Sequence, residues 1–203
     1  MPRTPKPKIS PRKQPTQARS QRTVNIILQA ATRVLTKESL AGFNTNRIAE
    51  VAGISVGSLY QYFPNKDALV TALIKAEHEI LIQRLRELGS KMATADARET
   101  LRALAKLAVA QQFVNPVFAA AIDHEEARLP LKKELEQVHN TLLHCVFEMT
   151  KPHFPNITLT EVQDCITIGQ ALVESEAGSA KAPPIDLEVR VYRALSGYLG
   201  LRD

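Results

Sequence analysis

Two short helical segments, separated by a glycine and closed by a proline, stand near the start of this 203-residue chain. They lie within TNRIAEVAGISVGSLYQYFPNKDAL, residues 45–69. Gly53 supplies the backbone conformation that a sharp turn needs, and Pro64 stops the second segment because its ring and missing N–H cannot continue a helix. Thr45 and Ser55 are suited to cap the first and the second segment. The spacing predicts a helix-turn-helix.

The rest of the chain also predicts helices. Apolar residues recur three or four positions apart, and proline or glycine separates the runs. Asn65 is placed to cap a long helix that Gly89 closes, and Thr158 with Glu161 has the spacing of a capping box. No stretch alternates with period two, so the expected fold class is all-α. The expected helices span about residues 20–40, 45–52, 55–62, 65–89, 95–112, 116–128, 131–149, 158–177 and 186–199.

Positive charge is concentrated at one end of the chain. Residues 1–75 hold 12 Lys and Arg against 3 Asp and Glu, and residues 76–203 hold 14 against 18, so the +5 total divides into +9 and −4. One basic end on an acidic body indicates a dedicated polyanion-binding head. No apolar run is long enough to span a membrane. The two cysteines predict no disulfide framework and favour a cytoplasmic location.

Three regions are expected. Residues 1–19 hold five prolines and no acidic residue, which predicts a flexible basic arm; a tail that only improves solubility is the alternative. Residues 20–66 form the predicted DNA-binding head, and residues 67–203 form a larger helical body.

The second helix of a helix-turn-helix enters the major groove of DNA with its N-terminal half. Small residues at 56–58 would let it approach the base edges closely, and the Ser58 hydroxyl can hydrogen-bond to a base. Lys66 begins the next helix, where a phosphate is its expected partner. Leu59 and Phe63 are expected to point into the core. The expected DNA-binding residues of this helix and its neighbour are Val56, Gly57, Ser58, Tyr60, Gln61, Tyr62 and Lys66.

These residues, together with the upstream ILQAATRVLTKESLAGF, resemble the DNA-binding signature of the TetR family of bacterial repressors. The resemblance covers about residues 20–70. It implies that Thr45 and Asn46 also face DNA and that the protein is a homodimer. It also implies that the body, residues 67–203, binds a small-molecule effector and provides the dimer contact. The implied function is a dimeric transcriptional repressor that leaves its double-stranded operator when an effector binds.

The body offers candidates for both implied sites. The dimer contact is expected on the last two long helices, whose apolar faces include small residues; the alternative is that these faces pack within their own chain. A largely apolar effector is expected. The pocket candidates are His78, Ile82, Phe113, Phe118, His144 and Phe147, and the dimer candidates are Ile166, Gly169, Leu172, Val191, Leu195 and Tyr198.

Other functions find less support in the sequence. No Gly-rich phosphate loop, nucleophile elbow or paired-carboxylate site is present, so we expect no enzyme and no cofactor. His139 and His144 do not share a helix face, and neither cysteine has a partner at zinc spacing, so no metal site is expected. The remaining alternative is a ligand-independent architectural DNA-binding protein, which the basic arm alone favours.

Overall fold

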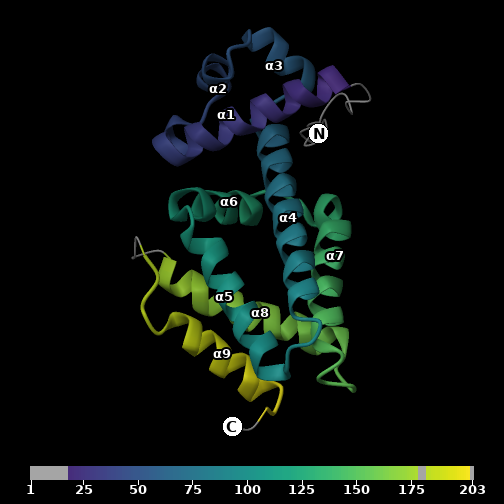
Figure 1. Ribbon diagram of the computed structural model, residues 1–203. Coiled ribbons are helices and arrows are strands. Elements are labelled where there is room, and N and C mark those ends of the chain that lie inside the picture. The colour runs from purple at the N-terminus through teal and green to yellow at the C-terminus, as the bar shows by residue number, and fades with distance from the viewer. Residues whose placement is uncertain (1–17, 178–181, 202–203) are drawn as a thin grey trace, which may run out of the picture. The chain divides into compact units, whose positions relative to one another are not determined.

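The computed structural model describes residues 18–177 and 182–201, and these residues form helices and no strand (Figure 1). The all-α prediction is confirmed. Of the expected arm, Ala18 and Arg19 already belong to the first helix, and residues 1–17 lie outside the described part. The helices are α1 (Ala18–Gly42), α2 (Thr45–Ala52), α3 (Val56–Tyr62), α4 (Lys66–Lys91), α5 (Ala97–Phe113), α6 (Pro116–Arg128), α7 (Lys132–Thr150), α8 (Leu159–Ala177) and α9 (Leu187–Tyr198).

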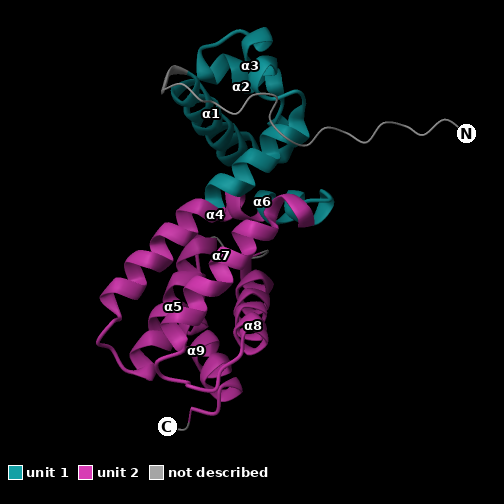
Figure 2. Cartoon of the chain, turned by 90° about the vertical axis from the view of Figure 1, so that its right-hand side faces the viewer, with its two compact units in different colours: residues 1–77, 121–131 teal, residues 78–120, 132–203 magenta. Residues whose placement is uncertain are grey.

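The chain divides into two compact units (Figure 2). Unit 1 contains the described residues up to Glu77 together with Ala121–Leu131, and unit 2 contains His78–Ala120 and the described residues from Lys132 onward. Helices α4 and α6 therefore each begin in one unit and end in the other. The predicted boundary between residues 66 and 67 stays a prediction.

Apolar side chains of the first four helices form the core of unit 1. Helix α2 packs against both α1 and α3. Each fully buried aliphatic or aromatic side chain stabilises the fold by about 1.5–3 kcal/mol relative to its exposed state. The largest buried side chains are Ile27, Val34, Leu35, Ile48, Leu59, Phe63, Leu69, Leu73 and Ile74.

Helix α1 bends before it ends. Ser39 has φ 55° and ψ −169°, a backbone conformation that is rare for residues other than glycine. One turn later the chain passes close to itself, because a Cβ atom added at Gly42 would lie 2.5 Å from the Cβ of Glu38. The bend places the Glu38 carboxylate 2.7 Å from Nε of Arg47 at the start of α2.

Helices α5, α8 and α9 form the core of unit 2, where each of the three packs against the other two. Their buried residues are Leu101, Ala105, Val109, Cys165, Val173, Leu187, Val191, Tyr192 and Leu195. The expected capping box of α8 is confirmed, since the Thr158 N–H donates to Glu161 and the Glu161 N–H donates to the Thr158 hydroxyl. Asp96 and Glu99 form a second box at α5 that the sequence interpretation did not include.

Among the described residues, none of the helices combines the length and the apolar content that a membrane crossing requires.

Candidate nucleic-acid interface

A tight glycine turn joins α2 to α3. Gly53 has φ 66°, which is the left-handed conformation expected of it, and its N–H donates to the carbonyl groups of Ala49 and Glu50. The side chain of Ser55 then caps α3 by accepting the Ser58 N–H at 3.0 Å. Both local predictions are confirmed. The two helices are thereby held at a fixed angle by backbone bonds and one side-chain cap.

The cap of α2 differs from the prediction. The side chain of Asn44 accepts the Arg47 N–H at 2.9 Å, and Thr45 is the first helical residue. The prediction of Thr45 as the cap is therefore wrong by one position. Asparagine and threonine both favour the N-cap position. Because Asn44 and Thr45 are adjacent, the sequence alone does not determine which of them caps the helix. The predicted cap of α4 is confirmed, because Asn65 accepts the Ala68 N–H at 2.8 Å.

The side chains of α3 and of Phe63, which caps its C-terminus, divide between two faces. Leu59 and Phe63, which is 1% exposed, point into the core as expected. Tyr60 is 40% exposed, and Gln61 beside it is exposed as well. The outer face of α3 therefore presents hydroxyl and amide groups, while the inner face anchors the helix.

The structure gathers the nine predicted DNA-binding residues within 22 consecutive positions of unit 1, from Thr45 to Lys66. Their contact with DNA stays a prediction. They are the exposed Asn46, Gly57, Tyr60 and Gln61, and the half-buried Thr45, Val56, Ser58, Tyr62 and Lys66.

Several of these side chains also contact each other or their neighbours. The hydroxyl groups of Thr45 and Tyr60 lie 3.2 Å apart, which links the start of α2 to the middle of α3. The hydroxyl of Ser58 lies 2.8 Å from that of Ser55. Lys66 Nζ lies 5.4 Å from the centre of the Phe43 ring, a cation–π contact. Sequence spacing predicted none of these contacts, which hold the polar side chains in position before any ligand binds.

Two arginines of unit 1 bind carboxylates of the protein. Arg47 contacts Glu38 at 2.7 Å and Glu50 at 2.9 Å, and the hydrogen bond that Arg47 donates to Glu38 is the main reason that the pKa of Arg47 is raised. Arg128, at the end of α6, contacts Glu125 at 2.5 Å and Asp67 at 2.7 Å. The second pairing joins the end of α6 to the first turn of α4 within unit 1, a link that sequence analysis missed.

The six predicted effector residues stay a prediction, and their exposure differs. Ile82 and Phe118 are buried, whereas His144 is exposed and lies edge-on to Phe147, with ring centres 6.4 Å apart. An open hollow on the face of α7 includes His144 and none of the other five. It is lined by Lys133, Glu136, Gln137, Asn140, Thr141 and His144, so it is polar, unlike the expected pocket.

The predicted dimer residues fall into two groups. Val191 and Leu195 are buried in the core of unit 2, and Gly169 faces Val191 of the same chain. These three positions pack within their own chain, and their part in a dimer contact stays a prediction. Ile166 and Leu172 are half-buried and Tyr198 is 44% exposed, and they stay predictions.

One of the two cysteines, Cys165, offers little nucleophilic character. Burial raises the pKa of the Cys165 thiol to about 11, with Asp164 and Glu161 adding to the effect. A thiol of that pKa stays protonated at neutral pH, and the thiolate is the reactive form. Cys165 therefore acts as a small apolar residue of the core.

A family profile described as bacterial regulatory proteins, tetR family, matches residues 27–73. The fatty acid metabolism regulator protein of Bacillus subtilis is 23% identical over 112 residues, which span 55% of this chain and 58% of that protein. The HTH-type transcriptional regulator TtgR of Pseudomonas putida is 39% identical over 64 residues, which span 32% of this chain and 30% of TtgR. This chain thus spans less than two thirds of these relatives' length.

Solved structures extend the similarity of fold to most of the chain. FadR from Bacillus subtilis in complex with stearoyl-CoA has a TM-score of 0.70 and 18% identity, covering 88% of this chain and 99% of that one. The TetR-like regulator LfrR from Mycobacterium smegmatis in complex with proflavine has a TM-score of 0.64 and 18% identity, covering 90% and 98%. At this identity the similarity shows the fold alone.

Proposed function

We propose that this chain, whose residues 27–73 match the profile of bacterial regulatory proteins of the tetR family, is a homodimeric, cytoplasmic transcriptional repressor released from its operator by a small molecule. The observation that carries the proposal is the outer face of α3. There Tyr60 and Gln61 are exposed, while Leu59 and Phe63 fix the helix from behind.

DNA recognition would combine base and phosphate contacts. The +9 charge of residues 1–75 supplies a sequence-independent attraction for the phosphate backbone. Exposed amide and hydroxyl groups on α3 supply donors and acceptors for base edges in the major groove. The hydrogen bond between Thr45 and Tyr60 holds the tyrosine ring before DNA arrives, which lowers the entropy lost on binding.

An effector would bind in unit 2. FadR of Bacillus subtilis is in complex with stearoyl-CoA and LfrR with proflavine, so chains of this fold accept large ligands with extensive apolar surface. The predicted pocket residues Ile82, Phe113, Phe118 and Phe147 all belong to unit 2 and supply apolar surface of that kind. An effector lowers operator affinity only when it binds the DNA-free conformation more tightly.

The second copy would lie against the outer sides of α8 and α9. Tyr198 is exposed there, and its hydroxyl donates to Asp164 at 2.5 Å, which joins the two helices. Val189 is a further exposed apolar residue of α9. The contact proposed here therefore uses Ile166, Leu172, Val189 and Tyr198 rather than the buried Val191 and Leu195.

DNA recognition is tested by selecting duplexes from a random-sequence library with the full chain and measuring affinity for the enriched sequence. Gln61→Ala should weaken binding by about 1–3 kcal/mol and relax preference at one base pair. Gln170→Ala is the matched control, since Gln170 is an exposed glutamine of α8. Failure to enrich any sequence, or equal affinity of the Gln61 and Gln170 variants, would refute the assignment of α3.

Release is tested on the same complex by adding stearoyl-CoA or proflavine and following anisotropy of labelled DNA. A ligand that weakens operator binding must itself bind less tightly to the DNA complex, by the same factor. If no compound from a broader apolar library changes operator affinity, the protein is the ligand-independent DNA binder.

A further inference from the structure

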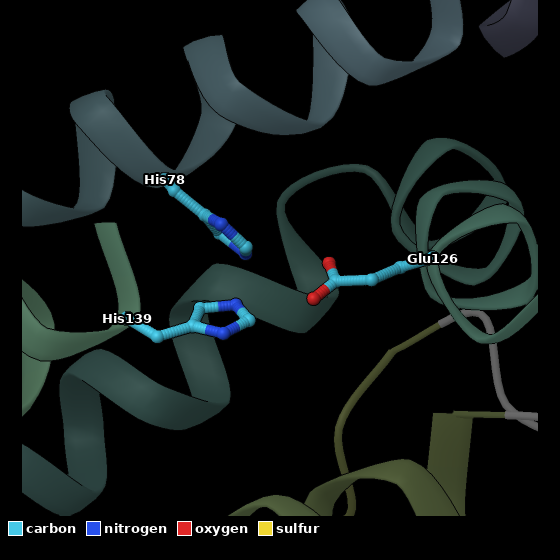
Figure 3. A group of neighbouring side chains, drawn as sticks. All are labelled: His78, Glu126 and His139. Atoms are coloured by element: carbon cyan, nitrogen blue, oxygen red, sulfur yellow. The ribbon is translucent and has the colours of Figure 1, made fainter. Parts of the chain in front are cut away.

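Two histidines from different helices of unit 2 face each other. His78 lies on α4 and His139 on α7, 61 positions apart in the chain. Their ring centres are 5.1 Å apart and the ring planes are inclined by 58° (Figure 3). Glu126, the third residue drawn there, belongs to unit 1, whereas both histidines belong to unit 2.

We propose that His78 and His139 form a binding site for a divalent transition metal ion of the kind that imidazole prefers, with Zn²⁺ as the reference ion. Imidazole nitrogen suits zinc, copper and nickel, whereas magnesium and calcium select oxygen ligands. Two protein ligands leave the remaining coordination positions of the ion to water or a further ligand. This site goes beyond the regulator proposed above and does not depend on its DNA binding.

The geometry requires only a small adjustment. Ring nitrogens of the two histidines lie within 4.8 Å of each other, and zinc–nitrogen bonds of about 2.0–2.1 Å let one ion span at most roughly 4.1 Å between two nitrogens. His139 is exposed and His78 is half-buried, so the His139 side chain is the one that would rotate to close the gap.

The protonation state of the inner histidine also suits a metal. Burial, with a smaller effect of His139, lowers the pKa of His78 to about 4. At neutral pH the ring is therefore uncharged, which is the form that coordinates a metal. A bound ion joins α4 to α7 within unit 2 and raises the thermal stability of the chain, because it binds the folded form alone.

The test uses the full chain, freed of any affinity tag and treated with a chelator. Zn²⁺ is titrated by calorimetry and equilibrium dialysis, with Mg²⁺ as the control ion. We expect about one Zn²⁺ per chain, no Mg²⁺ at the same concentration, and a Zn²⁺-dependent rise in Tm. His139→Ala should raise the Kd by about tenfold or more, since loss of an outer-shell partner alone costs 10–100-fold.

Three further variants make the test specific. His78→Gln should weaken Zn²⁺ binding as His139→Ala does, with folding checked by circular dichroism. His144→Ala, on the exposed side of the same α7, should bind Zn²⁺ like the wild type, and so should Cys145→Ser. The proposal is overturned if the wild type binds no Zn²⁺, or if the His139 and His144 variants bind equally. It is also overturned if Cys145→Ser removes binding. Because no DNA is present, failure here leaves the proposed regulator intact, and the reverse also holds.

Discussion

The head and the body of this chain depend on different kinds of sequence information. In the head, a glycine, a cap and an apolar pair within ten positions determine the turn, the helix start and the buried face, as Gly53, Ser55 and Leu59 with Phe63 show. In the body, the groups that meet come from helices far apart in the chain, as His78 and His139 show. Short motifs therefore predict local structure in the head more readily than contacts between distant helices in the body.

The sharpest test in the head compares neighbouring aromatic residues of opposite exposure. Phe63→Ala should lower the free energy of unfolding by about 3–5 kcal/mol, because it removes a buried ring and leaves a cavity. Tyr60→Ala should cost far less, since Tyr60 is 40% exposed whereas Phe63 is 1% exposed. Urea denaturation followed by circular dichroism measures both. Similar losses for the two variants would contradict the division of α3 into an inner and an outer face.

The equivalent test in the body separates core from dimer contact. Leu195 is 7% exposed, so Leu195→Ala should cost about 2–5 kcal/mol of stability. Tyr198→Ala should cost less stability and instead shift the mass measured by light scattering toward the monomer. A stable Leu195 variant that becomes monomeric would restore Leu195 to the dimer contact.

In the body, the sequence could not distinguish a side chain of the core from a side chain of a dimer contact. An apolar helix face looks the same whether its own chain or a second copy covers it, and Val191 and Leu195 proved to be covered by α5 and α8. In the head the turn and the helix end were predicted without such an ambiguity, because Gly53 and Pro64 restrict the backbone conformation directly. The exception is the start of α2, where Asn44 and Thr45 were both plausible caps and only the structure decided.

Removing a helix cap should lower stability less than removing a buried side chain does. Ser55→Ala should cost about 0.5–2 kcal/mol, because the Ser58 N–H loses its acceptor. Ser90→Ala is the control, since the hydroxyl of this exposed residue only donates to the Arg86 carbonyl within its own helix. Thermal unfolding measures both, and an equal effect would show that the cap contributes nothing to the turn.

The smallest expected effect is a loss of stability at low pH, which comes from the two capping boxes of the body. The Glu99 N–H lowers the pKa of Asp96, and the Thr158 hydroxyl lowers that of Glu161. A carboxyl group with a lowered folded pKa stabilises the protein above its unfolded value, here 3.8 and 4.5. That stability is lost as the pH falls through the folded pKa. Asp96→Asn and Glu161→Gln should therefore flatten the dependence of Tm on pH below about 5. If the curves of Tm against pH for the variants stay parallel to the wild-type curve, the two capping carboxylates are not the origin of the stability lost in acid.

The bend at the end of α1 has a consequence for protein engineering. Ser39 holds a conformation that costs a residue with a side chain on the order of 1–3 kcal/mol, so exchanging it for glycine should raise thermostability. Three positions later the existing glycine should be kept, because alanine at Gly42 would collide with Glu38. A consensus approach that replaces helical glycines and keeps helical serines would choose wrongly at both positions. Correct choices here would stabilise the head without altering any of the nine residues predicted to contact DNA.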